Sequence, residues 1–173
     1  IEARIQGEAV NLIELDMDLS RVKGLVLAHE GWHPGVIGIV ASRLLERYYR
    51  PVFLLSIDGD EAHGSGRAIE GINLADSLNT ADHLLLKHGG HKAAAGLTIK
   101  TKNIEEFQKH FNRYACEHLS DEDLVPKLDL DLEIQASHLT LDTIEELDLL
   151  EPFGQANQAP KLAIRGLTLQ RPP

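Results

Sequence analysis

Two short apolar runs with an amphipathic segment between them constrain the fold more than any other feature of this sequence. The runs are residues 25–28 and 52–55. The segment from Pro34 to about Tyr49 has apolar residues at helical spacing, at positions 36, 37, 40, 41, 44 and 48. Strand, helix and strand in this order are typical of a βαβ unit, whose parallel strands are buried under helices. The sequence therefore predicts an α/β fold with a mixed sheet flanked by helices.

Other elements are expected on both sides of this unit. Pro34 is expected at the first helical position, where its missing N–H costs nothing, and Pro51 is expected to end the helix. Asp58-Gly59 is typical of a hairpin turn, which would lead into a loop at residues 64–67. The remaining expected elements are helices over residues 2–19, from Asn73 to about Leu86 and from its cap at Asn103, with a strand over residues 93–99.

A polar, acidic and proline-ended stretch, residues 119–126, predicts a domain boundary. After it we expect strands over residues 128–134 and 162–169 with a helix over residues 141–150. Two strands cannot form a self-sufficient sheet, so this β-rich second module is expected to be incomplete. The first residue is Ile1 rather than Met, and the chain is interpreted as a fragment of a larger protein.

Composition narrows the class of protein. No apolar run approaches the roughly 20 residues that span a bilayer, and the first residues lack a signal-peptide pattern, so a cytoplasmic protein without membrane contact is expected. The single cysteine, Cys116, fits a reducing compartment. A formal net charge of -10 argues against a protein that coats nucleic acid through a basic surface. Screening over about 8 Å still allows a few arginines to form a local anion site.

The segment Gly64-Ser65-Gly66-Arg67 is the first candidate for such a site. Its glycines would let backbone approach a ligand, while the hydroxyl and the guanidinium can both donate to phosphate. A glycine-rich hairpin with a solvated arginine has the same pattern, so the segment alone leaves both interpretations open.

Gly89-Gly90-His91 is the second candidate. Small residues on both sides leave backbone accessible, and His91 could donate to a phosphate oxygen. The alternative is a tight turn into a buried strand.

Three further residues surround the predicted helix. Arg43, at the edge of its apolar stripe, could point from helix to site or lie along the surface. Trp32 could stack a base, although a lone tryptophan is more often a core residue. His33 precedes the helix N-terminus, which favours anions. Gly35, Gly38 and Ser42 give the helix a second face of small residues, suited to close approach of another protein element, which is favoured, or of a ligand's backbone.

Residues that could bind a metal are weak candidates. Asp129, Asp131 and Glu133 alternate along a predicted strand, which is also typical of a solvated strand face. No His-Glu-x-x-His pattern occurs, and no nucleophile has a base beside it in sequence. The sequence therefore predicts a protein that holds a substrate and does not cut it.

Three motifs occur together, in one order. They are residues 31–44 (Gly31-Trp32-His33-Pro34-Gly35 through Ser42-Arg43-Leu44), residues 64–67, and Gly89-Gly90-His91 followed by Ala94-Ala95-Gly96. Together they closely resemble the DHHA1 domain of the RecJ family of bacterial exonucleases specific for single-stranded DNA. The resemblance spans about residues 25–100.

This resemblance implies a 5′-to-3′ exonuclease of DNA repair and recombination. Its metal, Mn²⁺ or Mg²⁺, would be bound by an N-terminal DHH domain absent from this chain, which alone is expected to be inactive and to hold neither metal nor catalytic residue. The partners implied are single-stranded DNA and the DHH domain of the same polypeptide. Residues 1–23 would end an interdomain helix, residues 24–120 would form the DHHA1 domain, and residues 121–173 would begin an OB fold.

The resemblance also implies roles for individual residues. Ser65 and Arg67 would contact the 5′-terminal phosphate, Arg43 would reach the same phosphate, and Gly90-His91 would line the cleft near the metals. One segment departs from the family: residues 152–158 have Ala156 and Gln158 where the family usually has glycine and proline. Any DNA contact of that turn is therefore in doubt.

Two other functions fit some of these motifs. One is a DHH-family phosphodiesterase acting on short oligonucleotides or cyclic dinucleotides, which shares the Gly-Gly-His motif. The other is a non-catalytic nucleic-acid-binding module. The motif at residues 31–44 and the OB-like module favour the exonuclease.

Overall fold

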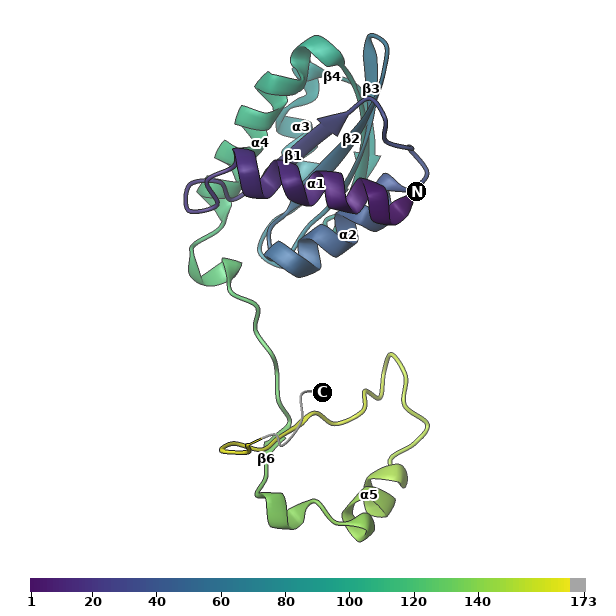
Figure 1. Cartoon of the computed structure of the whole chain (residues 1–173), viewed down its shortest axis with the longest axis vertical. Helices are drawn as coiled ribbons and strands as arrows, with labels where there is room; N and C mark the ends of the chain where they lie inside the picture. The colour runs from purple at the N-terminus through teal and green to yellow at the C-terminus, as the bar shows by residue number, and fades with distance from the viewer. Residues whose placement is uncertain (169–173) are drawn as a thin grey trace. The chain divides into compact units, whose positions relative to one another are not determined.

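The computed structural model describes residues 1–168 and divides the chain into two compact units. Unit 1 is Ile1–Pro126, and unit 2 begins at Lys127. Figure 1 shows the sheet and its helices in unit 1, and the shorter elements of unit 2. No helix within residues 1–168 is long and apolar enough to cross a lipid bilayer.

A five-stranded mixed sheet forms the centre of unit 1. Its strands, in spatial order, are β1 (Leu25–His29), β2 (Val52–Asp58), β3 (Glu61–Arg67), β5 (Ala94–Lys100) and β4 (Leu85–Gly90). β1 and β2 are parallel and are joined by α2 (Ile37–Tyr48), whereas the other neighbours are antiparallel. The predicted βαβ unit and the mixed sheet are confirmed.

Helices cover the sheet on both faces (Figure 1). α1 (Glu2–Asp16) and α2 share one apolar cluster with Leu25, Leu27, Val52 and Leu54. α3 (Leu74–Thr80) and α4 (Ile104–His118) share the other with the alternate residues of the same strands, including Val26, Phe53 and Leu55. Strands buried on both faces explain the continuous apolar runs in the sequence.

The predicted loop at residues 64–67 is wrong, because these residues belong to β3. They pair with β2 on one side and with β5 on the other. A Cβ on Gly64 would lie 2.7 Å from Leu55 Cδ2, and one on Gly66 would lie 2.3 Å from Phe53 Cε1. The missing side chains of both glycines therefore make room for the core, and they do not face a ligand.

Helix boundaries also differ from the predictions. Pro34 lies in a turn closed by the Val36 amide, which donates to the His33 carbonyl at 2.9 Å, so α2 begins three residues later than expected. α1 ends at Asp16 rather than near residue 19. Asn103 precedes α4, but its side-chain amide donates to the Leu84 carbonyl instead of capping the helix.

The helix expected to reach Leu86 ends at Thr80. A 3-10 turn, Asp82–Leu84, follows it, and Leu85 then pairs with Ile99 as the first residue of β4. Pairing with β5 therefore overrides the helical propensity of this leucine-rich segment. Asn73 does cap α3, because its Oδ1 accepts from the amides of Ala75 and Asp76.

Unit 2 has little regular structure within residues 127–168. β6 (Leu132–Glu133) and β7 (Leu162–Ala163) pair in parallel, and α5 (Leu141–Asp148) begins at Thr140, whose side chain accepts from the Thr143 amide. Both predicted strands are thus much shorter than expected, and residue 169 of the second lies outside the described residues. In the turn at residues 152–158, the side-chain amide of Asn157 donates to the carbonyls of Leu150 and Pro152.

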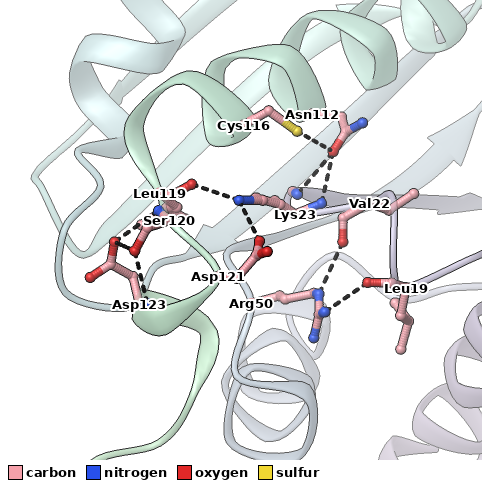
Figure 2. Close-up of polar contacts among 11 residues, drawn as sticks. Leu19, Val22, Lys23, Arg50, Asn112, Cys116, Leu119, Ser120, Asp121 and Asp123 are labelled. Carbon is pink, nitrogen blue, oxygen red and sulfur yellow. Dashed lines mark hydrogen bonds and ion pairs between the residues drawn. The ribbon is translucent and has the colours of Figure 1, made fainter.

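The segment that links α1 to β1, residues 17–24, is held by side chains on two sides (Figure 2). Arg50 donates to the carbonyls of Leu19 and Val22, at 2.8 and 2.9 Å. Lys23 Nζ donates to the Leu119 carbonyl at 2.9 Å and pairs with Asp121 at 2.7 Å. This hydrogen bond from Lys23 is the main cause that lowers the pKa of Asp121.

Asn112 of α4 completes this attachment. Its Oδ1 accepts from the backbone amides of Lys23 and Gly24, at 2.9 and 3.2 Å, and both bonds are partly buried (Figure 2). One side chain therefore satisfies two amides at the start of the first strand.

We predict that Asn112→Ala lowers the free energy of unfolding of unit 1 by about 1–3 kcal/mol, because it leaves partly buried amides without an acceptor. Urea unfolding followed by the fluorescence of Trp32, the single tryptophan and a buried residue of unit 1, measures this. Cys116→Ala is the control, because the exposed thiol touches Asn112 only at 3.8 Å. Equal stability of the two variants would contradict the role of Asn112.

Candidate functional site

Within residues 1–126, the helices leave one half of a sheet face uncovered. α2 packs on β2 and reaches β3, whereas β5 and β4 lie beyond it in the sheet. Strand alternation places eight residues on this side, which we call the open face: His63, Ser65, Arg67, Lys87, Gly89, Ala94, Gly96 and Thr98. All eight are exposed or half-buried, while Ala62, Ala95 and Leu97 on the opposite side are buried.

Arg67 and Ser65 lie at the border between the open face and α2. Arg67 Nη1 donates to the Gly66 carbonyl at 2.8 Å and lies 3.4 Å from Ser65 Oγ. Among residues 1–168, Arg67 forms no ion pair with a carboxylate. A half-buried guanidinium without a carboxylate partner is suited to an external anion.

Gly38, in the first turn of α2, packs directly on this pair. A Cβ at Gly38 would lie 3.0 Å from Ser65 Oγ and 3.3 Å from Arg67 Nη2. Within the described chain the Gly38 amide has no hydrogen-bond acceptor, as is usual in the first turn of a helix. A hydroxyl, a guanidinium and a free amide at the positive end of a helix thus lie together.

The two glycine motifs meet across β5. Gly89 pairs with Gly96, and Gly96 pairs with Ser65, so one row of the sheet joins both candidate segments. Gly90 has φ +147°, and a Cβ there would lie 2.4 Å from Ala95 Cα, so only glycine fits. His91 is exposed, and its amide donates to the Ala94 carbonyl at 2.8 Å, which closes the turn between β4 and β5.

Trp32 is not available to a base in this structure, so its burial fits the core alternative and does not fit stacking. Its side chain is 3% exposed, stacks on His29 and donates from Nε1 to Glu8 Oε2 at 3.0 Å. The hydrogen bond from Arg4, together with a smaller one from Trp32, lowers the pKa of Glu8. The buried tryptophan therefore links α1, through Glu8, to the apolar core. His33 is exposed, and its Nδ1 accepts from the Gly35 amide before α2.

Arg43 is directed toward α1 and does not reach the phosphate region as expected. Its Nη2 pairs with Glu2 at 2.6 Å, and its Nη1 donates to Gln6 at 3.1 Å. These two partners occupy the guanidinium in this structure. Of the residues named from sequence, those of segments 64–67 and 89–91 come together, whereas Trp32 and Arg43 contact α1.

Three residues on the open face were missed by sequence reasoning as functional candidates: His63, Lys87 and Thr98. A period of two from Ser65 along β3 would have found His63, and the cross-strand register then gives Thr98 and Lys87. Gly38 was predicted to lie on a face for close approach of a protein element or a ligand, and in the structure it lies against Ser65 and Arg67 of β3.

No group of three or more histidine, cysteine, aspartate or glutamate residues within residues 1–168 could hold a metal ion. Of the predicted strand's acidic residues, Asp131 accepts from the Lys161 amide and Glu133 pairs with Arg165 at 2.9 Å. The residues described here therefore do not fit a divalent cation.

Residues 21–117, which contain α2 and the whole open face, match the model of the DHHA1 domain family. The chain belongs to the DHHA1 family. Residues 130–172 match the RecJ OB domain, so the DHHA1 domain here is followed by an OB domain of the RecJ type. The family resemblance expected from the sequence is confirmed.

Proteins named single-stranded-DNA-specific exonuclease RecJ are similar over almost the whole chain. The Bacillus subtilis protein is 36% identical over 170 residues, covering 97% of this chain and 21% of its own length. The Dickeya dadantii protein is 40% identical over 179 residues, covering 99% and 31%. This DHHA1 chain thus spans about a fifth to a third of the length of these relatives.

Solved structures agree with the fold. RecJ of Thermus thermophilus in complex with Mg²⁺ superposes with a TM-score of 0.74 at 34% identity, covering 92% of this chain and 24% of its own. The same protein in complex with Mn²⁺ gives 0.72 at 35% identity, with 91% and 23% covered. The relatives' structures therefore contain divalent metals, while residues 1–168 of this DHHA1 chain provide no cluster for one.

Proposed function

We propose that this chain is the substrate-binding part of a RecJ-like 5′-to-3′ exonuclease that degrades single-stranded DNA in repair and recombination, in the cytoplasm. In this proposal Arg67, Ser65 and the Gly38 amide hold the 5′-terminal phosphate. Gly90 and His91, at the end of β4, would contact the first nucleotide. His33 and Arg43 would act at most from the border of this site.

The observation that carries the proposal is the guanidinium of Arg67, which forms no ion pair with a carboxylate within residues 1–168, beside a floor of glycine. A Cβ on Gly89 would meet no atom within 4 Å, and one on Gly96 would meet only the Gly64 carbonyl, at 3.6 Å. Neither residue has a positive φ. Glycine weakens a strand, and here neither packing nor backbone conformation requires it. Close approach of a ligand accounts for both glycines.

Hydrolysis is assigned to a DHH domain of the same polypeptide, consistent with the Mg²⁺ and Mn²⁺ in the solved RecJ structures. Metal bound there would supply the activated water. The residues of this chain would bind the phosphate through charge-assisted hydrogen bonds and orient the strand, which raises the effective concentration of the reacting groups. The RecJ-type OB domain favours this function over a phosphodiesterase for dinucleotides.

A comparison of the full-length protein with the chain alone tests the proposal. With Mn²⁺, the full-length protein is expected to release 5′-mononucleotides from a 5′-phosphorylated single strand, and the 173-residue chain to release none. A 3′-labelled oligonucleotide separated on a gel shows the direction of shortening. Digestion by the chain alone, or shortening from the 3′ end, would contradict the proposal.

A further inference from the structure

A groove of about 340 Å³ crosses the sheet next to the proposed phosphate site. Its lining comes from three neighbouring strands: Gly64 of β3, Lys87, His88 and Gly89 of β4, and Gly96, Leu97 and Thr98 of β5. Gly89 and Gly96 form the floor as a cross-strand pair; a Cβ on Gly89 would meet no atom within 4 Å, and one on Gly96 only the Gly64 carbonyl. The groove therefore begins at the row that contains Ser65 and extends to the edge strand.

The next row of the open face carries polar side chains. His63 pairs with Thr98, and Thr98 pairs with Lys87 across the three strands. The His63 ring and the Thr98 hydroxyl are hydrogen-bonded at 3.3 Å. Lys87 is exposed and forms no ion pair in the described part of the chain. The nearest acidic position on this side of β3 is Glu61, which lies opposite Lys100.

A β-bulge turns Lys87 toward the groove. Leu85 pairs with Ile99, but Lys87, rather than Leu86, pairs with Thr98, so one extra residue is accommodated in β4. Without it, Leu86 and His88 would lie on the open face, and Lys87 and Gly89 would lie on the other. The irregularity thus places a cation and a bare backbone position in the groove together, a use of bulges that is common beside functional sites.

We propose that this groove is a second nucleotide subsite, which takes the nucleotide following the 5′-terminal one and pairs the phosphate on its 3′ side with Lys87, while the phosphate between the two nucleotides is the one cleaved at the DHH domain. The inference rests on the proposed function of the Arg67 site. The sheet spacing puts Lys87 about 12 Å from Ser65 between Cα atoms, counted as two strands across and two residues along. The flat glycine floor fits a sugar or base, and the ammonium fits a phosphate as a point charge.

Binding by full-length Lys87→Ala protein tests the subsite, with Ca²⁺ in place of Mn²⁺ to prevent cleavage. The probes are thymidine 5′-monophosphate and a 5′-phosphorylated oligothymidylate of six nucleotides. Lys87→Ala is expected to weaken hexanucleotide binding about three- to tenfold and to lower the slope of log affinity against log salt by about 0.7. Binding of the mononucleotide is expected to stay unchanged.

Two further variants make the outcomes distinct. Lys109→Ala removes an exposed lysine from α4, on the opposite side of the sheet, and should change neither probe. Arg67→Ala should weaken both probes. Loss with Arg67→Ala but an unchanged hexanucleotide affinity for Lys87→Ala would overturn the subsite and leave the proposed function intact. Failure of Arg67→Ala to affect either probe would overturn the proposed function itself.

Discussion

Arg67→Ala in the full-length enzyme is expected to weaken binding of 5′-phosphorylated single strands by about 10- to 100-fold, and that of 5′-hydroxyl strands far less. The reason is the geometry at the border of the open face, where the guanidinium has no carboxylate partner among the described residues 1–168 and lies beside Ser65 Oγ. Hydrogen bonds between charged groups contribute about 1.5–3 kcal/mol each. Only a strand with a terminal phosphate would make them.

Titration of labelled oligonucleotides that differ only in the 5′ group measures this preference. Arg67→Lys is the matched variant, because it keeps the charge and loses the planar fork of donors, so it should retain part of the preference. Arg113→Ala on α4 controls for loss of positive charge away from the site. An equal loss on phosphorylated and hydroxyl strands would rule out a role at the terminal phosphate.

Gly66→Ala is expected to lower the free energy of unfolding of unit 1 by about 1–3 kcal/mol or more, as overpacked cores do. The added methyl group would lie 2.3–2.6 Å from ring atoms of Phe53. That ring is fully buried and packs edge-on against Phe107 and Phe111, so it has little room to move. Urea unfolding followed by Trp32 fluorescence gives the difference.

Gly96→Ala, one strand away, is the matched control with the opposite expectation. Its methyl group would meet only the Gly64 carbonyl, at an ordinary contact distance of 3.6 Å, so stability should be unchanged or rise by about 0.4–1 kcal/mol as the unfolded chain loses freedom. Binding of single strands should instead weaken, because the methyl group enters the groove. If the two variants lost equal stability, the distinction between core glycines and floor glycines would be wrong.

The sequence predicted the architecture well where local patterns decide it. α2 lies between two buried strands in the chain as expected, since an amphipathic helix leaves an apolar pattern of helical period and a covered parallel pair leaves continuous apolar runs. Residues 64–67 were predicted as a loop because glycine is common in turns. In the structure these residues form a strand, and its glycines leave room for the side chains of Phe53 and Leu55. Only the neighbouring strands distinguish the two cases.

The sequence identified residues of the candidate site but did not predict how they are arranged. Residues 64–67 and 89–91 meet because β5, which follows both in sequence, lies between β3 and β4 in the sheet. Trp32 does not contact the site, because it hydrogen-bonds to Glu8 of α1. Arg43 likewise contacts Glu2 and Gln6 of α1, which are distant from it in sequence. The bulge that faces Lys87 to the groove depends on cross-strand register, which no residue type near Leu86 indicates.

That bulge also affects how copies of the molecule behave toward one another. β4 is an edge strand, so one side of its backbone has hydrogen-bonding groups that another chain could extend into a larger sheet. A bulge interrupts the regular spacing that such pairing needs, and a lysine at the same place adds charge repulsion between like copies. The irregularity that shapes the groove is therefore also expected to disfavour aggregation through this edge strand.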